Sequence, residues 1–119
     1  MATFSLTSLS ASTNGEPIQI TAVGTAGNPI HTAQASAVGW DQIFFWATNT
    51  DTVSRLLTVE WGVAGTSAGH LVEQYSLPAH SAPIPIATGQ ILNNALVVSA
   101  FADLTAKVNI TGHVLRITP

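Results

Sequence analysis

The sequence contains no cysteine, and only nine of its 119 residues carry a formal charge, three basic and six acidic. Without cysteine, a disulfide scaffold, a thiolate metal site and a cysteine nucleophile are all excluded. Three basic side chains also exclude nucleic-acid binding by charge neutralisation, because affinity for a phosphate backbone comes mainly from Lys and Arg. The charged fraction is 8%, compared with about 25% in ordinary domains, so we expect a largely uncharged surface.

Long apolar runs are also missing. No stretch approaches the roughly 18 residues of a membrane-spanning helix, so we expect no membrane partner. Residues 1–15 lack both the positive charge and the unbroken apolar stretch of a secretory signal, which predicts synthesis in the cytoplasm without export. The hydrophobic fraction of 46% and net charge of −3 exclude disorder. A folded chain with so few charges indicates apolar surface that something else covers.

Helical periodicity is absent, whereas strand patterns bounded by turn residues occur throughout. The eight expected strands are Ile18–Val23, Ile30–Gln34, Gln42–Thr48, Arg55–Trp61, Leu71–Leu77, Ala82–Ala87, Ala95–Ala102 and Lys107–Ile117. Strands at this spacing with no helices between them predict an antiparallel β-sandwich or barrel. We expect one β-sandwich domain over residues 18–119, and an arm or an added strand over residues 1–17.

Two of these strands are apolar on both faces, which a two-layer sandwich does not explain. They are Gln42–Ala47 and Ala95–Phe101. The second face could be covered by loops or the N-terminal segment, or by another subunit, and the pattern leaves both open. Pro83 and Pro85 predict that their strand is an edge or an irregular segment, because proline cannot donate to a sheet ladder.

A serine-hydrolase pattern is present but is interpreted as accidental. Residues 65–69 read Gly-Thr-Ser-Ala-Gly, and Asp103 and His113 follow in the order of a catalytic triad. That pattern works only where a strand turns sharply into a helix, and here a strand pattern follows Ser67. The acidic residues are scattered, so no carboxylate pair for glycoside hydrolysis is expected. We expect no enzyme activity and no catalytic residue.

The four histidines, His31, His70, His80 and His113, lack the short spacings of zinc motifs. We therefore expect no metal site and no cofactor. The three tryptophans, Trp40, Trp46 and Trp61, could stack on sugar rings, but tryptophans within or beside apolar strands are more often core residues, and a core position is favoured.

The chain resembles small structural proteins of tailed bacteriophages, particularly capsid decoration (cement) proteins. The resemblance lies in residues 46–51 (WATNTD), 57–62 (LTVEWG), 71–74 (LVEQ), 77–83 (LPAHSAP), 92–98 (LNNALVV), 100–102 (AFA) and 108–117 (VNITGHVLRI). It implies a jelly-roll-like homotrimer on the outer surface of the virion head, at junctions between capsomers, with the major capsid protein as its partner.

The residues that would contact the shell are hypothesised to include Phe4, Leu6 and Leu9 of the N-terminal segment. Two alternatives remain: a structural component of the phage tail or baseplate, and a carbohydrate-binding β-sandwich module that uses an exposed Trp or Tyr75.

Overall fold

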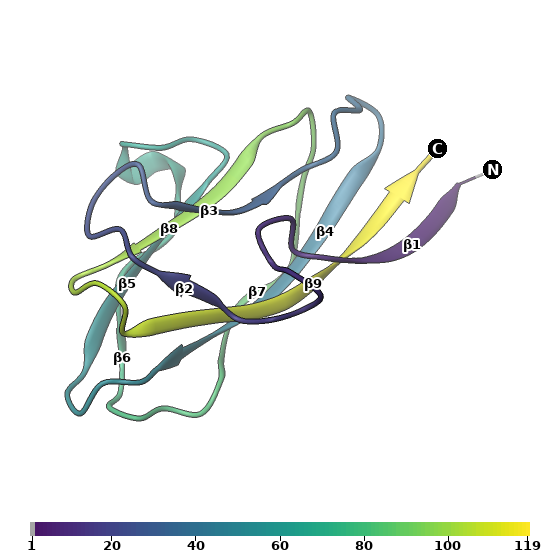
Figure 1. Ribbon diagram of the computed structural model, residues 1–119. Helices are drawn as coiled ribbons and strands as arrows, with labels where there is room; N and C mark the ends of the chain where they lie inside the picture. The colour runs from purple at the N-terminus through teal and green to yellow at the C-terminus, as the bar shows by residue number, and fades with distance from the viewer. Residues whose placement is uncertain (1) are drawn as a thin grey trace.

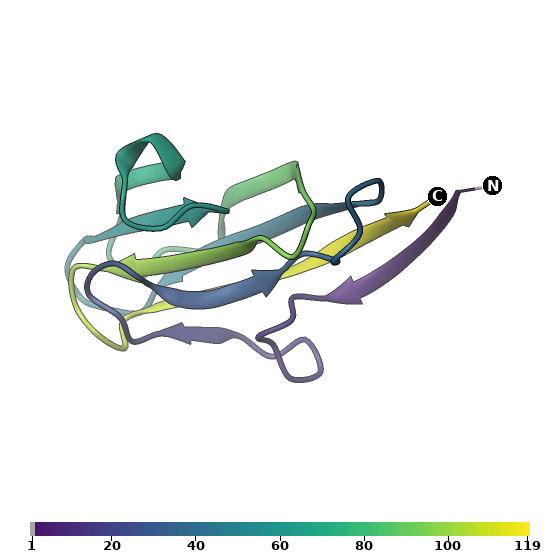
Figure 2. The same cartoon turned by 90° about the horizontal axis from the view of Figure 1, so that it is seen from above.

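In the computed structural model, which describes residues 2–119, the chain folds into two antiparallel sheets packed face to face (Figures 1 and 2). These residues form nine strands and one short 3₁₀ turn. The strands are β1 (Thr3–Ser8), β2 (Ile18–Ile20), β3 (Asn28–Thr32), β4 (Trp40–Asn49), β5 (Arg55–Trp61), β6 (His70–Leu77), β7 (Ile84–Leu92), β8 (Val97–Ala102) and β9 (Val108–Thr118), and the turn is η1 (Ser67–Gly69). The predicted all-β sandwich is confirmed.

The strand pairing is nested. Strand β5 pairs with β6, β4 with β7, β3 with β8 and β2 with β9. These pairs are arranged in two sheets. One has the order β1-β9-β4-β7, in which β2 also pairs with β9, and the other has the order β3-β8-β5-β6. We call them sheet A and sheet B. Two four-stranded antiparallel sheets built this way are a jelly roll, to which β1 adds one strand.

The core lies between the two sheets and follows the alternation of the strands. In β4 the buried residues include Ile43, Phe45 and Ala47, whereas the residues between them are only partly buried. Because side chains alternate between the faces of a strand, β4 presents one face to the core and the other to the outside. The buried face meets Leu57 and Val59 of sheet B in one continuous apolar cluster.

The expected strands agree with the structure in their positions, but several differ in their first and last residues. Strand β7 was expected over Ala82–Ala87 but runs over Ile84–Leu92, past a glycine at residue 89 with φ of +108°. It lies at the edge of sheet A, and its register with β4 shifts twice, as Pro83 and Pro85 predicted. The N-terminal segment was expected to be either an arm or an added strand. Strand β1 in this segment pairs with β9 over its whole length.

Candidate functional site

The outer face of sheet A is an extended surface without formal charge. Residues opposite each other in an antiparallel pair point to the same side of the sheet, so the register with β4 and β9 defines this face. Its members are Phe4, Leu6, Ser8, Trp40, Gln42, Phe44, Trp46, Thr48, Pro85, Thr88, Ile91, Asn109, Thr111, His113, Leu115 and Ile117. None of them is buried. More than half are apolar, and together they cross four strands.

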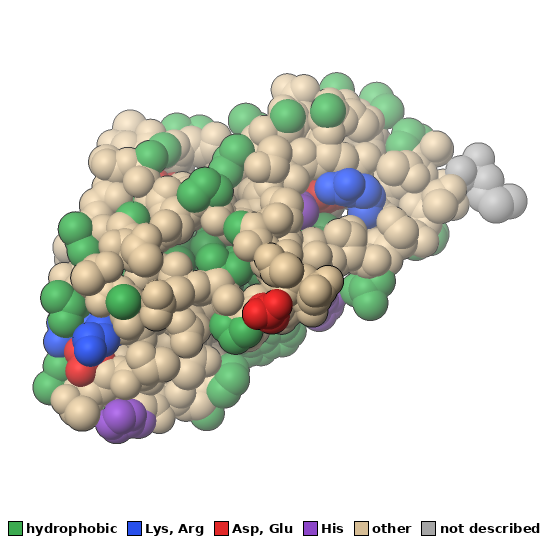
Figure 3. All heavy atoms as spheres, in the orientation of Figure 1, with side chains coloured by type: hydrophobic (Ala, Val, Ile, Leu, Met, Phe, Trp, Pro, Cys, Tyr) green, Lys and Arg blue, Asp and Glu red, His purple; other side chains and the backbone are tan. Residues whose placement is uncertain are grey.

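No Asp, Glu, Lys or Arg lies on this outer face. The charged residues of β4 and β9, Asp41 and Arg116, both lie at alternate positions that point to the inner side. His113 is the only titratable side chain on the face. Figure 3 shows a face of the molecule on which small blue, red and purple groups are scattered over a surface that is mostly tan and green. An apolar surface without charge is typical of an interface.

Three aromatic rings of this face lie close together. The rings of His113 and Phe44 stack, with centroids 5.0 Å apart and planes 18° apart, and the ring of Trp46 is tilted against His113, at 5.9 Å and 31°. Aromatic side chains are enriched in the cores of protein interfaces, where charged residues are depleted. The cluster and the absence of charge on this face are typical of a contact surface.

Two of the three hypothesised contact residues lie on the outer face of sheet A. Phe4 is 63% exposed and Leu6 is 75% exposed, and both are on β1. Leu9 is fully buried in the core, so its proposed surface role is wrong. The chain leaves β1 after Ser8 and turns inward, because Ser10 and Ala11 hydrogen-bond to β3, which carries Leu9 between the sheets.

A polar network lies between the sheets close to β1. The buried Asp41 carboxylate accepts hydrogen bonds from Arg116 Nε and Nη2, both at 2.8 Å, and from His31 Nε2 at 2.7 Å. Gln34 donates two more. The Ser10 amide donates to His31 Nδ1 at 3.0 Å, so the proton of the neutral ring must sit on Nε2 and point at Asp41.

This network fixes the charge of Asp41. Burial alone would raise its pKa, but the hydrogen bonds from Arg116 and His31 and the charge of Arg116 outweigh burial and lower the pKa of Asp41 to about 2. The donors of Asp41 come from β3, β9 and the segment after β3. The carboxylate is therefore a structural anchor, and its lone pairs are taken up by the protein.

The outer face of sheet B is built differently. Glu60 of β5 points outward, yet it is fully buried. Its carboxylate accepts from the Gly65 amide at 2.8 Å, the Gly27 amide at 3.0 Å, and the hydroxyls of Ser99 and Thr25 at 2.8 and 2.5 Å. Burial would raise its pKa, but these four hydrogen bonds lower it to about 2. Glu60 thus holds two loops against sheet B.

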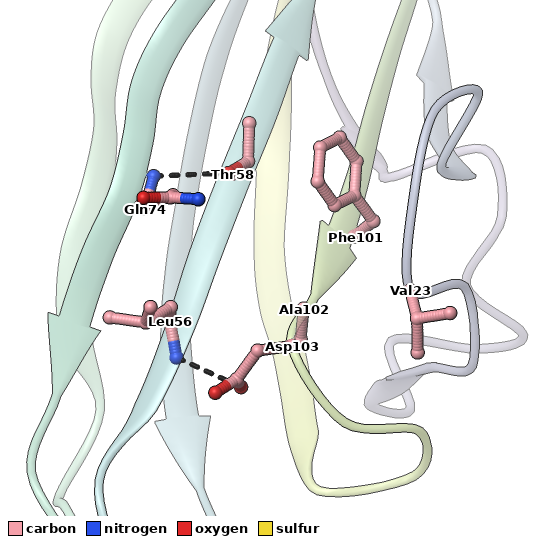
Figure 4. Close-up of a pocket in the computed structure, with 7 residues that line it drawn as sticks. All are labelled: Val23, Leu56, Thr58, Gln74, Phe101, Ala102 and Asp103. Atoms are coloured by element: carbon pink, nitrogen blue, oxygen red, sulfur yellow. Dashed lines mark hydrogen bonds between the residues drawn. The ribbon is translucent and has the colours of Figure 1, made fainter.

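Beside these loops lies a small cavity of about 120 Å³ (Figure 4). Two backbone amides bond to side chains of its lining: the Gln74 N–H donates to Thr58 Oγ1 at 3.0 Å and the Leu56 N–H to Asp103 Oδ1 at 3.1 Å. Ligand pockets are usually about 300–1,000 Å³. The cavity is smaller than a typical ligand site.

The triad pattern is not assembled. Ser67 begins the single 3₁₀ turn η1, which leads directly into β6, so the required strand-to-helix turn is absent there. Asp103 bonds to Arg55 and to the Leu56 amide on sheet B. His113 lies on the outer face of sheet A, whereas Ser67 precedes a strand of sheet B.

The histidines and tryptophans are dispersed. His31 is in the buried network, His70 bonds to Glu73 at 2.9 Å, and His113 is on the outer face of sheet A. Within residues 2–119 no group of three metal-ligating side chains comes together. Trp61 packs against the core as favoured, but Trp40 and Trp46 do not, because their alternate positions on β4 face outward.

Comparisons with protein-family models, with curated proteins and with solved structures found no match for this chain. Fold and surface therefore define its class by themselves: a jelly-roll β-sandwich with one uncharged, largely apolar sheet face. No helix formed by residues 2–119 has the length and apolar character to span a membrane.

Proposed function

We propose that this protein is a non-enzymatic virion structural protein, a capsid decoration protein that binds the outer head at capsomer junctions. Its partners would be the major capsid protein and further copies of itself, as a homotrimer. The observation that carries the proposal is the outer face of sheet A, which is uncharged and mostly apolar across four strands. A face of this kind is favourable when another protein surface covers it.

The fold supports the proposal by analogy. Jelly rolls are common among viral capsid domains, but also among lectins, so fold alone does not decide function. The uncharged outer face of sheet A, which is apolar at more than half of its positions, favours the first of these classes. The resemblance to decoration proteins, which spans roughly residues 30–117, is the basis for the location on the head, the trimer and the capsid partner.

The mechanism would be binding without chemistry. Once one subunit of an oligomer engages the shell, the others act at high effective concentration, so modest contacts give firm attachment. A protein that binds the assembled shell and not its separated parts stabilises the shell by mass action. The uncharged face suits this role because an apolar contact does not weaken with salt as an ionic one does.

Substitution of Ile91 by lysine tests the proposal. Ile91 is 49% exposed on the outer face of sheet A, and the matched control Val53→Lys alters a 51% exposed valine outside it. We expect wild type and V53K to bind capsids assembled without this protein, and I91K to lose at least tenfold in affinity, measured by co-sedimentation. Binding to isolated tails alone would favour the tail component, and binding to neither particle would refute a virion role.

A further inference from the structure

Strand β1 leaves one edge of sheet A open. It pairs with β9 on one side, and within residues 2–119 no strand pairs with its other side. Figures 1 and 2 show β1 at the extremity of the molecule, beside the end of β9. An unpaired strand edge presents a row of free backbone N–H and C=O groups, which is a template for pairing with another chain.

The other long edges are interrupted. Strand β7 carries Pro85, and its register with β4 shifts twice. Strand β6 carries the charged Glu73 followed by Gln74 in a left-handed conformation, φ +47°, and its register with β5 also shifts. Proline, charge and irregular register are the usual means by which edge strands avoid pairing.

The remaining edges are covered or short. Strand β3 receives a hydrogen bond at Ile30 O from the Ala11 amide, and its Thr32 amide donates to Ser10 Oγ. Strand β2 has only three residues. By contrast, the six residues of β1 include no proline, glycine or charge, and none has a positive φ. Strand β1 is therefore the edge that lacks these protections.

The side chains of β1 are complementary to themselves. Phe4 and Leu6 point to the outer face of sheet A, and Thr3, Ser5 and Thr7 point to the other side. If two antiparallel copies meet with Ser5 opposite Ser5, then each Phe4 lies opposite a Leu6 and each Thr3 opposite a Thr7. A shift by two residues would pair Leu6 with Leu6 but leave Phe4 opposite Ser8, or pair Phe4 with Phe4 but leave Leu6 opposite Ala2, so it keeps one apolar pair instead of two. A shift by one would put the two outer faces on opposite sides of the joined sheet.

We propose that β1 pairs with β1 of a second copy of this chain across a two-fold axis at Ser5. The joined strands make one continuous sheet from two copies of sheet A, with Phe4 of one copy against Leu6 of the other on its outer face. Cross-strand aromatic and aliphatic pairs of this kind stabilise sheets. Since the strand carries no charge, two copies meet without like-charge repulsion.

This contact goes beyond the proposed function. A two-fold contact joins a pair of copies, so it is distinct from the three-fold contact within a trimer, and it can link two neighbouring trimers or two single subunits. The contact follows from β1 and its edge, whether or not the protein binds a capsid. Failure to bind capsids would therefore refute the proposed function and leave the β1 contact in place.

Single cysteines test the register, because the natural chain has none. In Ser5→Cys the two thiols sit on the axis, on Cα atoms about 4.5–5.5 Å apart, within the range of a disulfide. In Thr3→Cys or Thr7→Cys alone the two thiols lie about 14 Å apart along the strands. We expect disulfide-linked dimers from S5C, none from T3C or T7C alone, and mixed dimers when T3C and T7C are combined.

A second substitution separates edge pairing from chance collision. Leu6→Lys in the S5C background places a charge at the contact, and Val53→Lys, at a 51% exposed valine beyond the opposite end of β4, is the control. We expect cross-linking to fall at least tenfold with L6K and to stay unchanged with V53K. Absence of S5C dimers over a series of protein concentrations, or equal cross-linking of all single cysteines, would overturn the proposal.

Discussion

The outer faces of the two sheets make an instructive contrast. On sheet B, Thr58, Glu60 and Ser99 point outward and are all buried, because Glu60 binds residues of two loops. On sheet A, none of the sixteen outward residues is buried, and none carries a carboxylate or a cation. On sheet B, loops of the same chain cover Glu60 and Ser99, and no part of the described chain covers the outer face of sheet A in this way.

The contrast shows what holds a loop on a sheet. The backbone N–H groups of a loop need hydrogen-bond acceptors when the loop is buried. On sheet B, the carboxylate of Glu60 is the acceptor. The outer face of sheet A offers mainly apolar side chains, to which a loop backbone cannot hydrogen-bond. A second folded surface, whose backbone groups are already paired, suits this face better.

The largest expected effect is acid destabilisation. The pKa values of Asp41 and Glu60 are both lowered in the folded state, from 3.8 and 4.5 to about 2. Their stabilisation is complete above the unfolded values and is lost as pH falls from about 4.5 towards 2. We expect the free energy of unfolding, from urea titrations, to drop by about 5 kcal/mol between pH 7 and pH 2. A change below about 1 kcal/mol would contradict the anchoring role of both carboxylates.

The next effect isolates the sheet B face. In Glu60→Gln one carboxylate oxygen is replaced by an NH₂ group. This group cannot accept the hydrogen bonds that the loop amides and hydroxyls donate to Glu60. We expect a loss of about 3 kcal/mol in the free energy of unfolding at pH 7, and a smaller further loss on acidification than wild type shows. Glu73→Gln, at a carboxylate that is 57% exposed, is the control and should be nearly neutral. Equal effects of the two substitutions would remove the contrast between the faces.

The smallest effect concerns stability on sheet A, where adjacent residues of β4 give a matched pair. Phe44 lies on the outer face and is partly exposed, whereas Phe45 is fully buried in the core. We expect Phe44→Ala to cost about 1 kcal/mol and Phe45→Ala about 3–5 kcal/mol, measured by urea denaturation. If F44A proved as costly as F45A, the outer face would belong to the folded core and would not be reserved for contact.

Much of the fold was readable from the sequence because strands leave local signals. The strand patterns and the turn residues between apolar runs predicted the sandwich, and the prolines predicted the β7 edge. The end of β7 was missed because the glycine at residue 89 resembles a terminator, although the strand continues past it. Leu9 was misplaced because alternation within a short segment does not show where the chain turns inward.

The outer face of sheet A was only half predictable. The two-sided apolar character of Gln42–Ala47 and Ala95–Phe101 indicated a second cover, but the same pattern has opposite outcomes in the two strands. Loops held by Glu60 cover β8, and none of the chain described covers β4 in this way. The sequence does not separate these cases, because the bonds of Glu60 reach from residue 60 to residues 25, 27, 65 and 99.

The sequence by itself determined that this protein is all-β, poor in charge, and apolar on more strand faces than one core can use, since composition and alternation are local properties. Only the tertiary structure decided that the pairing is nested, that the charges lie off one sheet face, and that β1 keeps an open edge. These features depend on which distant strands become neighbours. Strands pair through backbone hydrogen bonds, which are nearly the same for every residue type, so the local sequence does not specify the partner of a strand.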